Sequence, residues 1–339
     1  MQNDLKIAVI GATGLVGREI LAALAERKHS AGKITAFASE RSEGLEVDYG
    51  DDTLEVEKVT EEAFRGIGLA IFATPPEASR ALIPWARRAG VSVIDLSSAF
   101  RSDPACVLVA PTVRRLGDQT PAVSGKWVRC PSVGAMVSAT LLNPLDAQYG
   151  LVAIEMVGLI SASSAGVRGV SELQQQTASL LSANELDEGR FPHRLAFNVI
   201  PQVGTVSEVA GWTSEEALWK NDWETLWVSE LKPKLMFSAL QIPTFHGHLF
   251  QITFQLRQSA AIEQIREYFK KIPSVKVLDS LGEKIYPMPM LIAADSSIHV
   301  GRIRANPAFE NSFSLTAVID NVVRGAALNA LETADLMFR

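Results

Sequence analysis

The sequence predicts an α/β protein of two domains, a doubly wound dinucleotide-binding domain and a mixed α+β domain. Three observations lead to this fold class. A glycine-rich loop directly follows the first apolar run, short apolar runs then alternate with helical patterns, and longer apolar runs occupy the chain after about Pro131. Strands that alternate with helices form parallel sheets covered by helices on both faces. Longer runs that end on polar turns are typical of a mixed or antiparallel sheet.

Each predicted element depends on the spacing of apolar residues along the chain. In the first domain we expect strands over residues 7–10, 34–38, 69–73, 92–96 and 107–110, with crossover helices over residues 15–27 and 77–89. In the second domain we expect a helix over 134–149 and strands over 152–161, 234–242, 247–256, 298–304 and 311–319. A last helix, over residues 321 to about 337, closes the chain.

The composition is that of a globular protein and disfavours several kinds of partner. A length of 339 residues with 47% hydrophobic residues suits two domains with full cores. The net charge of −6 argues against nucleic acid and anionic membrane surfaces, which need a basic footprint. No apolar stretch reaches the roughly 20 residues of a membrane span, and the first residues lack the apolar segment of a signal peptide. The two cysteines, Cys106 and Cys130, have no metal-ligand or disulfide spacing. We therefore expect a cytoplasmic protein with reduced cysteines and no metal.

A glycine loop lies between the first predicted strand and the first predicted helix. Residues 11–17 read Gly-Ala-Thr-Gly-Leu-Val-Gly, in the strand–loop–helix context of a Rossmann-type fold. The glycines allow a tight turn and a close backbone approach, and the helix N-terminus attracts a pyrophosphate. An alternative is a glycine turn kept for packing after binding was lost. The cofactor-binding residues predicted in this loop are Gly11, Thr13, Gly14, Leu15, Val16 and Gly17.

The end of the second predicted strand favours NADP over NAD. NAD sites place an acidic residue there to bind the ribose 2′-hydroxyl, whereas NADP sites offer arginine and small hydroxyl groups. The sequence offers Ser39, Arg41 and Ser42, which suit a 2′-phosphate, and Glu40, which opposes one. We therefore predict NADP as the cofactor, with NAD as the alternative.

Several stretches beyond the loop resemble the aspartate-semialdehyde dehydrogenase family, and in particular a side branch that lacks the catalytic cysteine, the Usg-type proteins. The resemblance implies a homodimer of subunits with a dinucleotide-binding domain (residues 1–132 with 320–339) and a substrate and dimerisation domain (residues 133–319). No single stretch is decisive, but their order and spacing are specific. They cover residues 38–44, 97–101, 197–202, 242–243 with 247–248, and 320–330.

The family's chemistry implies four side-chain roles, of which only one keeps its residue type. A thiolate attacks the aldehyde, a glutamine orients it, an arginine pairs with the substrate carboxylate, and a histidine handles the proton. By position, Val133 takes the place of the thiol at the start of a helix, and Ile160 that of the glutamine. Gln241 takes the place of the arginine, whereas His248 matches the histidine.

Other positions implied by the family partly favour and partly oppose cofactor and phosphate binding. Arg101 matches the phosphate-binding arginine, and Asn321 lies in the matching C-terminal stretch, where we expect it to contact the cofactor. Pro75 and Pro76 replace a pair of glycines in the loop after the third strand. Two prolines remove two backbone donors where the family brings backbone close to the cofactor, so they put cofactor binding in question.

Three features have plainer explanations beside the functional ones. Cys130 stands three residues before the nucleophile position and is either a displaced nucleophile or a small buried residue. His248 is either an acid–base group or a hydrogen-bonded buried residue. Tryptophans recur every four residues from Trp219 to Trp227 and line one helix face, which is either core or a partner surface.

Three functions follow from these residues. The first is a homologue that binds NADP or NAD and dimerises but has no dehydrogenase activity. The second is an active NADP-dependent aspartate-semialdehyde dehydrogenase of amino-acid biosynthesis. The third is a non-covalent NADP-dependent oxidoreductase that uses His248. The loss of three of four roles favours the first function, because removing a covalent nucleophile costs on the order of 10⁶ in rate.

Overall fold

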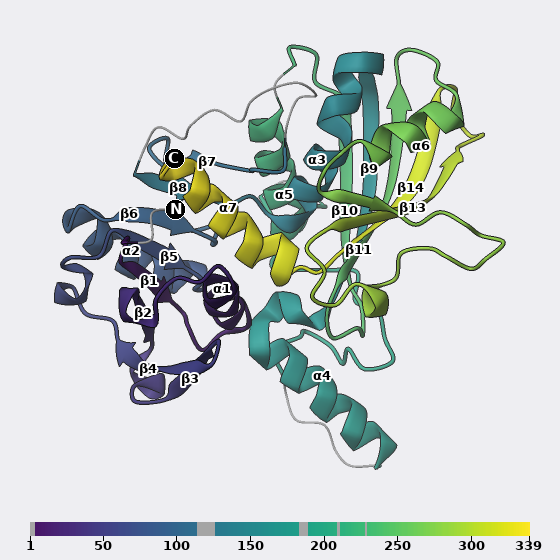
Figure 1. The fold of residues 1–339 in the computed structure, drawn as a ribbon. Helices are drawn as coiled ribbons and strands as arrows, with labels where there is room; N and C mark the ends of the chain where they lie inside the picture. The colour runs from purple at the N-terminus through teal and green to yellow at the C-terminus, as the bar shows by residue number, and fades with distance from the viewer. Residues whose placement is uncertain (1–3, 114–125, 183–188, 209–210, 228) are drawn as a thin grey trace. The chain divides into compact units, whose positions relative to one another are not determined.

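A computed structural model describes residues 4–113, 126–182, 189–208, 211–227 and 229–339 (Figure 1). The chain divides into two compact units. The first is made by the chain up to Pro111, a segment ending at Pro131, and the C-terminal residues from Ala326. The second comprises Ser132–Gly325 and a short segment that begins at Thr112. Residues 114–125 lie outside the described residues, so the bounds of the two units within that segment are not given.

The first unit is a doubly wound sheet, as the alternating pattern predicted. Its strand order is β3-β4-β2-β1-β5-β6-β8-β7, and every pair is parallel except β3–β4. Along β1, Ile7 and Val9 pack with α1 and α7, whereas Ala8 and Ile10 pack with α2 on the other face. The strands are β1 (Ile7–Ile10), β2 (Ile34–Ala38), β3 (Glu46–Tyr49), β4 (Asp52–Lys58), β5 (Leu69–Phe72), β6 (Ser92–Asp95), β7 (Val107–Leu108) and β8 (Trp127–Arg129), and the helices are α1 (Leu15–Glu26), α2 (Pro76–Arg88) and α7 (Leu328–Met337).

The second unit is a mixed sheet with helices packed on one face. Its strand order is β10-β9-β11-β14-β13-β12, with parallel pairs at both ends and antiparallel pairs between them. Every second residue of β11 is buried, and those from Phe250 to Leu256 lie in one core with residues of α3, α5 and α6. The strands are β9 (Leu151–Ile160), β10 (Lys234–Gln241), β11 (His248–Leu256), β12 (Val275–Val277), β13 (Ile298–Ala305) and β14 (Ser312–Ile319), and the helices are α3 (Val133–Tyr149), α4 (Gly166–Leu181), α5 (Ser214–Leu226) and α6 (Ile262–Lys270).

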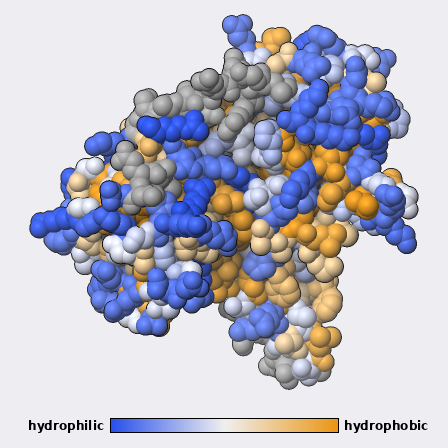
Figure 2. All heavy atoms as spheres, in the orientation of Figure 1, coloured by the Kyte–Doolittle hydropathy of each residue, from blue (hydrophilic) through white to orange (hydrophobic). Residues whose placement is uncertain are grey.

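The other face of this sheet is only half covered. Residues such as Val157, Leu240 and Leu249 alternate with the buried ones and are half-buried, and Met236 on the edge strand β10 is exposed. Figure 2 shows hydrophobic side chains among hydrophilic ones over the strands of this unit. A sheet with one apolar, partly open face is typical of a surface that meets another molecule.

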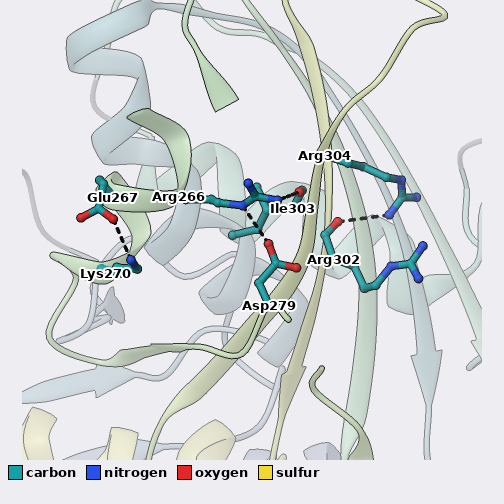
Figure 3. A network of polar contacts seen from close by, with 7 residues as sticks. All are labelled: Arg266, Glu267, Lys270, Asp279, Arg302, Ile303 and Arg304. Atoms are coloured by element: carbon teal, nitrogen blue, oxygen red, sulfur yellow. Dashed lines mark hydrogen bonds and ion pairs between the residues drawn. The ribbon is translucent and has the colours of Figure 1, made fainter. Parts of the chain in front are cut away.

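At the β12 edge, a polar network holds α6 against β13 (Figure 3). Arg266 of α6 donates to the Asp279 carboxylate and to the Ile303 carbonyl oxygen, both at 3.0 Å. The pairing of β13 with β14 shifts register between Gly301 and Arg304. Gly301 has no room for a Cβ beside the Leu278 carbonyl, and Arg302 adopts a φ of 55°. This bulge therefore bends the strand around the loop that follows β12.

The prediction for the last helix was wrong in where the α-helix begins. A continuous α-helix was expected from residue 321, but Val323–Ala327 is a π-helical turn and the α-helix begins at Leu328. A π-turn adds one residue to the turn, which the apolar period does not reveal. Among the described residues, no helix combines the length and apolar character needed to cross a membrane.

Candidate functional site

The glycine loop joins β1 to α1 and is fastened to the end of β2. The backbone N–H groups of Gly11 and Ala12 donate to the Phe37 carbonyl oxygen at 2.8 and 3.0 Å. A Cβ at Gly11 would collide with the Ala73 carbonyl, and a Cβ at Gly17 with the carbonyl of Gly11 itself. These two glycines are therefore required by the packing of the loop, whether or not a ligand binds.

The first turn of α1 nevertheless suits an anion. Gly14 is the N-cap residue and offers no side chain, and the turn contains no acidic residue. The N–H groups of Leu15, Val16 and Gly17 have no acceptor within the helix, because the first turn of any α-helix lacks them. Backbone donors at the positive end of a helix dipole match a pyrophosphate. The predicted loop residues thus lie together where a dinucleotide fold needs them.

The turn after β2 holds the residues predicted to choose the cofactor. Glu40–Ser42 forms a 3₁₀ turn, closed by the Ser42 N–H donating to the Ser39 carbonyl at 2.8 Å. Lys58 on the neighbouring strand β4 pairs with Glu40 at 2.8 Å, and this hydrogen bond lowers the pKa of that carboxyl group. Lys58 therefore offsets the charge that would oppose a 2′-phosphate. Lys58 is not among the predicted site residues, because β4 was not predicted.

The two prolines start helix α2. Pro75 is the N-cap residue and Pro76 the first helical residue, a position that proline favours. The Ser79 N–H donates to the Pro75 carbonyl at 3.0 Å, and the hydroxyl groups of Thr74 and Ser79 lie 2.8 Å apart. The prolines thus fit the local fold well, although neither contributes an N–H group. Arg101, predicted to bind phosphate, is half-buried in a turn after β6.

Val133 is the first residue of α3, at the helix start where a thiol would be activated. A Cβ added to Gly325 would lie 3.1 Å from a Val133 methyl group, so the side chain packs against the chain after β14. The N–H of the preceding Ser132 donates to the Asp222 carboxylate at 2.8 Å. A valine side chain at this helix start cannot attack a carbonyl group.

Neither cysteine of the protein supplies a substitute thiol. Cys106 and Cys130 are free and buried, and they are the chain's only cysteines. Burial raises the pKa of each thiol to about 12, and for Cys130 this effect outweighs the smaller opposing effects of the Thr333 and Asn329 side chains. Both thiols are therefore protonated at neutral pH, whereas nucleophilic attack needs the thiolate.

Ile160 and Gln241 lie side by side at the ends of two parallel strands. They are register partners in the β9–β10 pair, and both are buried. The Gln241 side-chain amide donates to the Ile160 carbonyl at 2.7 Å, and its backbone exchanges two hydrogen bonds with Ile200. Gln241 is thus neutral and is held by the protein's own backbone.

His248, the first residue of β11, belongs to a buried polar cluster. Its Nδ1 lies 3.0 Å from the Ser161 hydroxyl, and Ser161 in turn lies 2.9 Å from the Ser163 hydroxyl. Asn321 accepts hydrogen bonds from Ser163 and from the Gly247 N–H. Asn321, predicted to contact the cofactor, thus lies in the second unit with His248. The two serines were missed, because only the folded ends of β9 and β11 bring them to the histidine.

Burial decides the charge of His248. The side chain is about 5% exposed, and removal from water lowers its pKa to about 3, against a smaller opposing effect of the Gly247 backbone. A buried imidazole without a carboxylate partner is more stable uncharged. His248 is therefore neutral at physiological pH.

His248 is expected to make the protein less stable in acid. Its pKa of about 3 in the folded state lies below the ordinary 6.5, so the unfolded chain binds more protons between these values. The free energy of unfolding then falls as pH drops below 6.5, by at most about 1.4 kcal/mol per pH unit for one group. Urea unfolding of the wild type and His248→Gln between about pH 7.5 and about pH 4 should show a shallower slope in the variant. The exposed His193→Gln is the control; equal slopes in all three proteins would contradict the assignment.

Comparisons with known proteins agree with the resemblance found in the sequence. The family model described as semialdehyde dehydrogenase, NAD binding domain, matches residues 6–117, and the model of the dimerisation domain matches residues 142–324. An aspartate-semialdehyde dehydrogenase of Aquifex aeolicus is 31% identical over 98% of both chains. A USG-1 protein homolog of Pseudomonas aeruginosa is 33% identical over 100% of this chain and 99% of its own.

A solved structure matches the fold over its whole length. Aspartate semialdehyde dehydrogenase II of Vibrio cholerae, crystallised in complex with ASA, superposes with a TM-score of 0.89. It is 27% identical, and the match covers 100% of this chain and 99% of that one. Both domain models and full-length relatives above 30% identity therefore agree, and the chain belongs to the semialdehyde dehydrogenase family.

Proposed function

We propose that this protein binds NADP and dimerises but has lost the dehydrogenase chemistry of its family. One observation carries the proposal: the helix start that should present the thiol carries Val133, and the chain's only two cysteines are buried with a raised pKa. Covalent catalysis of aldehyde oxidation needs a thiolate at that place. Without one, the loss in rate is on the order of 10⁶, by analogy with other covalent nucleophiles.

Two further substitutions support the same proposal. Ile160 cannot orient a nucleophile, since its side chain has no polar atom. Gln241 cannot form an ion pair with a substrate carboxylate, and its amide is bonded to the Ile160 carbonyl. A charged arginine normally binds a carboxylate by two parallel hydrogen bonds, which a neutral amide does not replace. The nucleophile, its orienting group and the charge partner of the substrate are then absent together.

NADP is the proposed cofactor. The first turn of α1 supplies backbone donors for a pyrophosphate, and Ser39, Arg41 and Ser42 supply a cation and two hydroxyl groups for a 2′-phosphate. The Lys58 ammonium group adds a positive charge beside Glu40. Arginine and hydroxyl groups at this strand end are typical of NADP sites, so NAD is expected to bind more weakly.

We also propose that the subunit contact uses the open face of the second sheet. The matched dimerisation domain contains all six strands of that sheet. Half-buried apolar residues of β9, β10 and β11 share this face, and Met236 on β10 is exposed. Apolar surface of this kind is stabilised when a second copy covers it.

Calorimetry with NADP and NAD tests the nucleotide proposal. The wild type is expected to bind NADP more tightly than NAD. Arg41→Ala should weaken NADP binding by roughly tenfold and leave NAD binding unchanged, because one charge-assisted hydrogen bond contributes about 1.5 kcal/mol or more. The exposed Arg65→Ala in the same unit is the matched control and should change neither affinity. Failure of the wild type to bind either nucleotide would contradict the proposal.

A further inference from the structure

The open face of the second sheet carries a row of side chains that crosses four strands. Glu155 of β9, Thr253 of β11, Ser314 of β14 and Arg304 of β13 are successive register partners. The residues that precede them in the sequence lie in the buried core on the helix side, and the hydroxyl groups of Thr253 and Ser314 lie 2.9 Å apart. Because side chains alternate between the two faces of a sheet, all four point away from the helices.

The two ends of this row carry opposite charges. Glu155 and Arg304 are exposed, and in Figure 3 the Arg304 side chain extends to the side of β13 opposite Arg266 of α6. The register shift after Gly301 adds one residue to β13, so that Ile303 enters the core and Arg304 points outward. Three strand spacings of about 4.8 Å separate the two charged residues, which is too far for an ion pair within one chain.

The same face is apolar at another level along its strands. Leu240, Leu159 and Leu249 are register partners on β10, β9 and β11, and all three are half-buried. A second copy that covers this face has to match both levels, because a charge set against leucines would lose water without gaining a partner. A two-fold axis across the strands would bring charges opposite leucines or Glu155 opposite its own copy. An axis parallel to the strands keeps each level opposite the same level of the other subunit.

We propose that a second copy of this chain docks on this face about a two-fold axis parallel to β11 and β14, with Glu155 paired to Arg304 of the partner subunit. β11 and β14 are the two central strands of six, so this axis lies over the middle of the sheet. Glu155 lies one strand beyond β11 and Arg304 one strand beyond β14. Rotation about the axis therefore brings each opposite the other. Since the contact is isologous, the ion pair forms twice, once on each side of the Thr253–Ser314 hydroxyl pair. This inference rests on the proposed subunit contact through the open face and adds its register.

Charge reversal in the full-length chain tests the pairing. Analytical ultracentrifugation at low ionic strength, where charges are screened least, gives the dimer Kd. Glu155→Arg and Arg304→Glu should each raise the Kd at least roughly tenfold, because each sets like charges against one another at both symmetric contacts. The double variant Glu155→Arg with Arg304→Glu has opposite charges again and should bring the Kd back toward that of the wild type. Glu263→Arg, at an exposed residue of α6 on the other side of the sheet, is the control and should leave the Kd unchanged.

Recovery in the double variant also separates a lost ion pair from a misfolded chain, because a second substitution does not repair a misfolded one. A double variant that dimerises no better than the single ones would overturn the pairing, and so would Arg304→Glu with the Kd of the wild type. A wild type that stays monomeric would overturn the proposed subunit contact itself, and the pairing with it. The two failures are therefore distinguished by the wild type alone.

Discussion

Replacing Val133 by cysteine is expected to leave the protein without family-level dehydrogenase activity. The start of α3 would lower the pKa of a thiol there, so the new cysteine should react with iodoacetamide. Turnover needs more than a thiolate, and neither Ile160 nor Gln241 can orient it or pair with the substrate. We expect phosphate-dependent NADP reduction with aspartate semialdehyde to stay at least about 10⁴-fold below the rate of a catalytic relative, since losing one orienting partner alone can cost that much.

The triple variant Val133→Cys, Ile160→Gln, Gln241→Arg is the matched comparison for this prediction. It restores all three roles at once and should exceed the single variant, provided that it keeps the same unfolding midpoint in urea. Iodoacetamide labelling of the single variant shows whether its thiol is reactive. A labelled variant without turnover has a reactive thiol that does not support catalysis. A rate for the single variant within about 100-fold of that of a catalytic relative would show that Ile160 and Gln241 do not prevent turnover.

Trp219→Ala is expected to destabilise the second unit by about 3–5 kcal/mol, the usual cost of deleting a buried tryptophan. Its ring is 1% exposed and packs edge-on against Phe237 and Phe250. The ring also fills space that two glycines leave open: a Cβ at Gly134 would lie 2.6 Å from it, and one at Gly158 would collide with it. Smaller side chains cannot fill a slot of this shape, so a cavity should remain.

Urea unfolding followed by circular dichroism measures this loss. Leu181→Ala, at a side chain that is 77% exposed, is the control and should stay within about 0.5 kcal/mol of the wild type. Gly158→Ala should also destabilise, by about 1–3 kcal/mol, because it overpacks the same slot from the other side. A loss below about 1 kcal/mol for Trp219→Ala would mean that the ring is not a central part of this core.

The fold class and most elements could be predicted because their signals are local. The loop of residues 11–17, the buried strands and the amphipathic helices each repeat with a period that one stretch of sequence displays. The β3–β4 hairpin was missed for the opposite reason. β3 has only four residues, and β4 buries only Val56 of its seven, so the apolar alternation is too short to stand out in the sequence. Lys58, at the end of β4, was missed with it.

The candidate site could be predicted only in part. The tryptophans were recognised as one helix face, and all three are buried, but the space that Trp219 fills depends on Gly134 of α3 and Gly158 of β9, which no local pattern connects to it. Ser161 contacts His248 across 87 residues of sequence, and Ser163 contacts Asn321 across 158. Such contacts exist only once β9 and β11 pair. Residue types along a strand therefore predict that a site is present, whereas the tertiary fold decides which residues complete it.

The most direct test of the proposed function is a dehydrogenase assay of the wild-type protein. The same preparation is first tested for NADP binding by calorimetry. The protein is mixed with aspartate semialdehyde, phosphate and NADP, and NADPH formation is followed by absorbance, with a catalytic relative as the positive control. We expect a rate lower than that of the relative by a factor on the order of 10⁶, the cost of an absent nucleophile. NADPH formation at a rate comparable to that of the relative would contradict it.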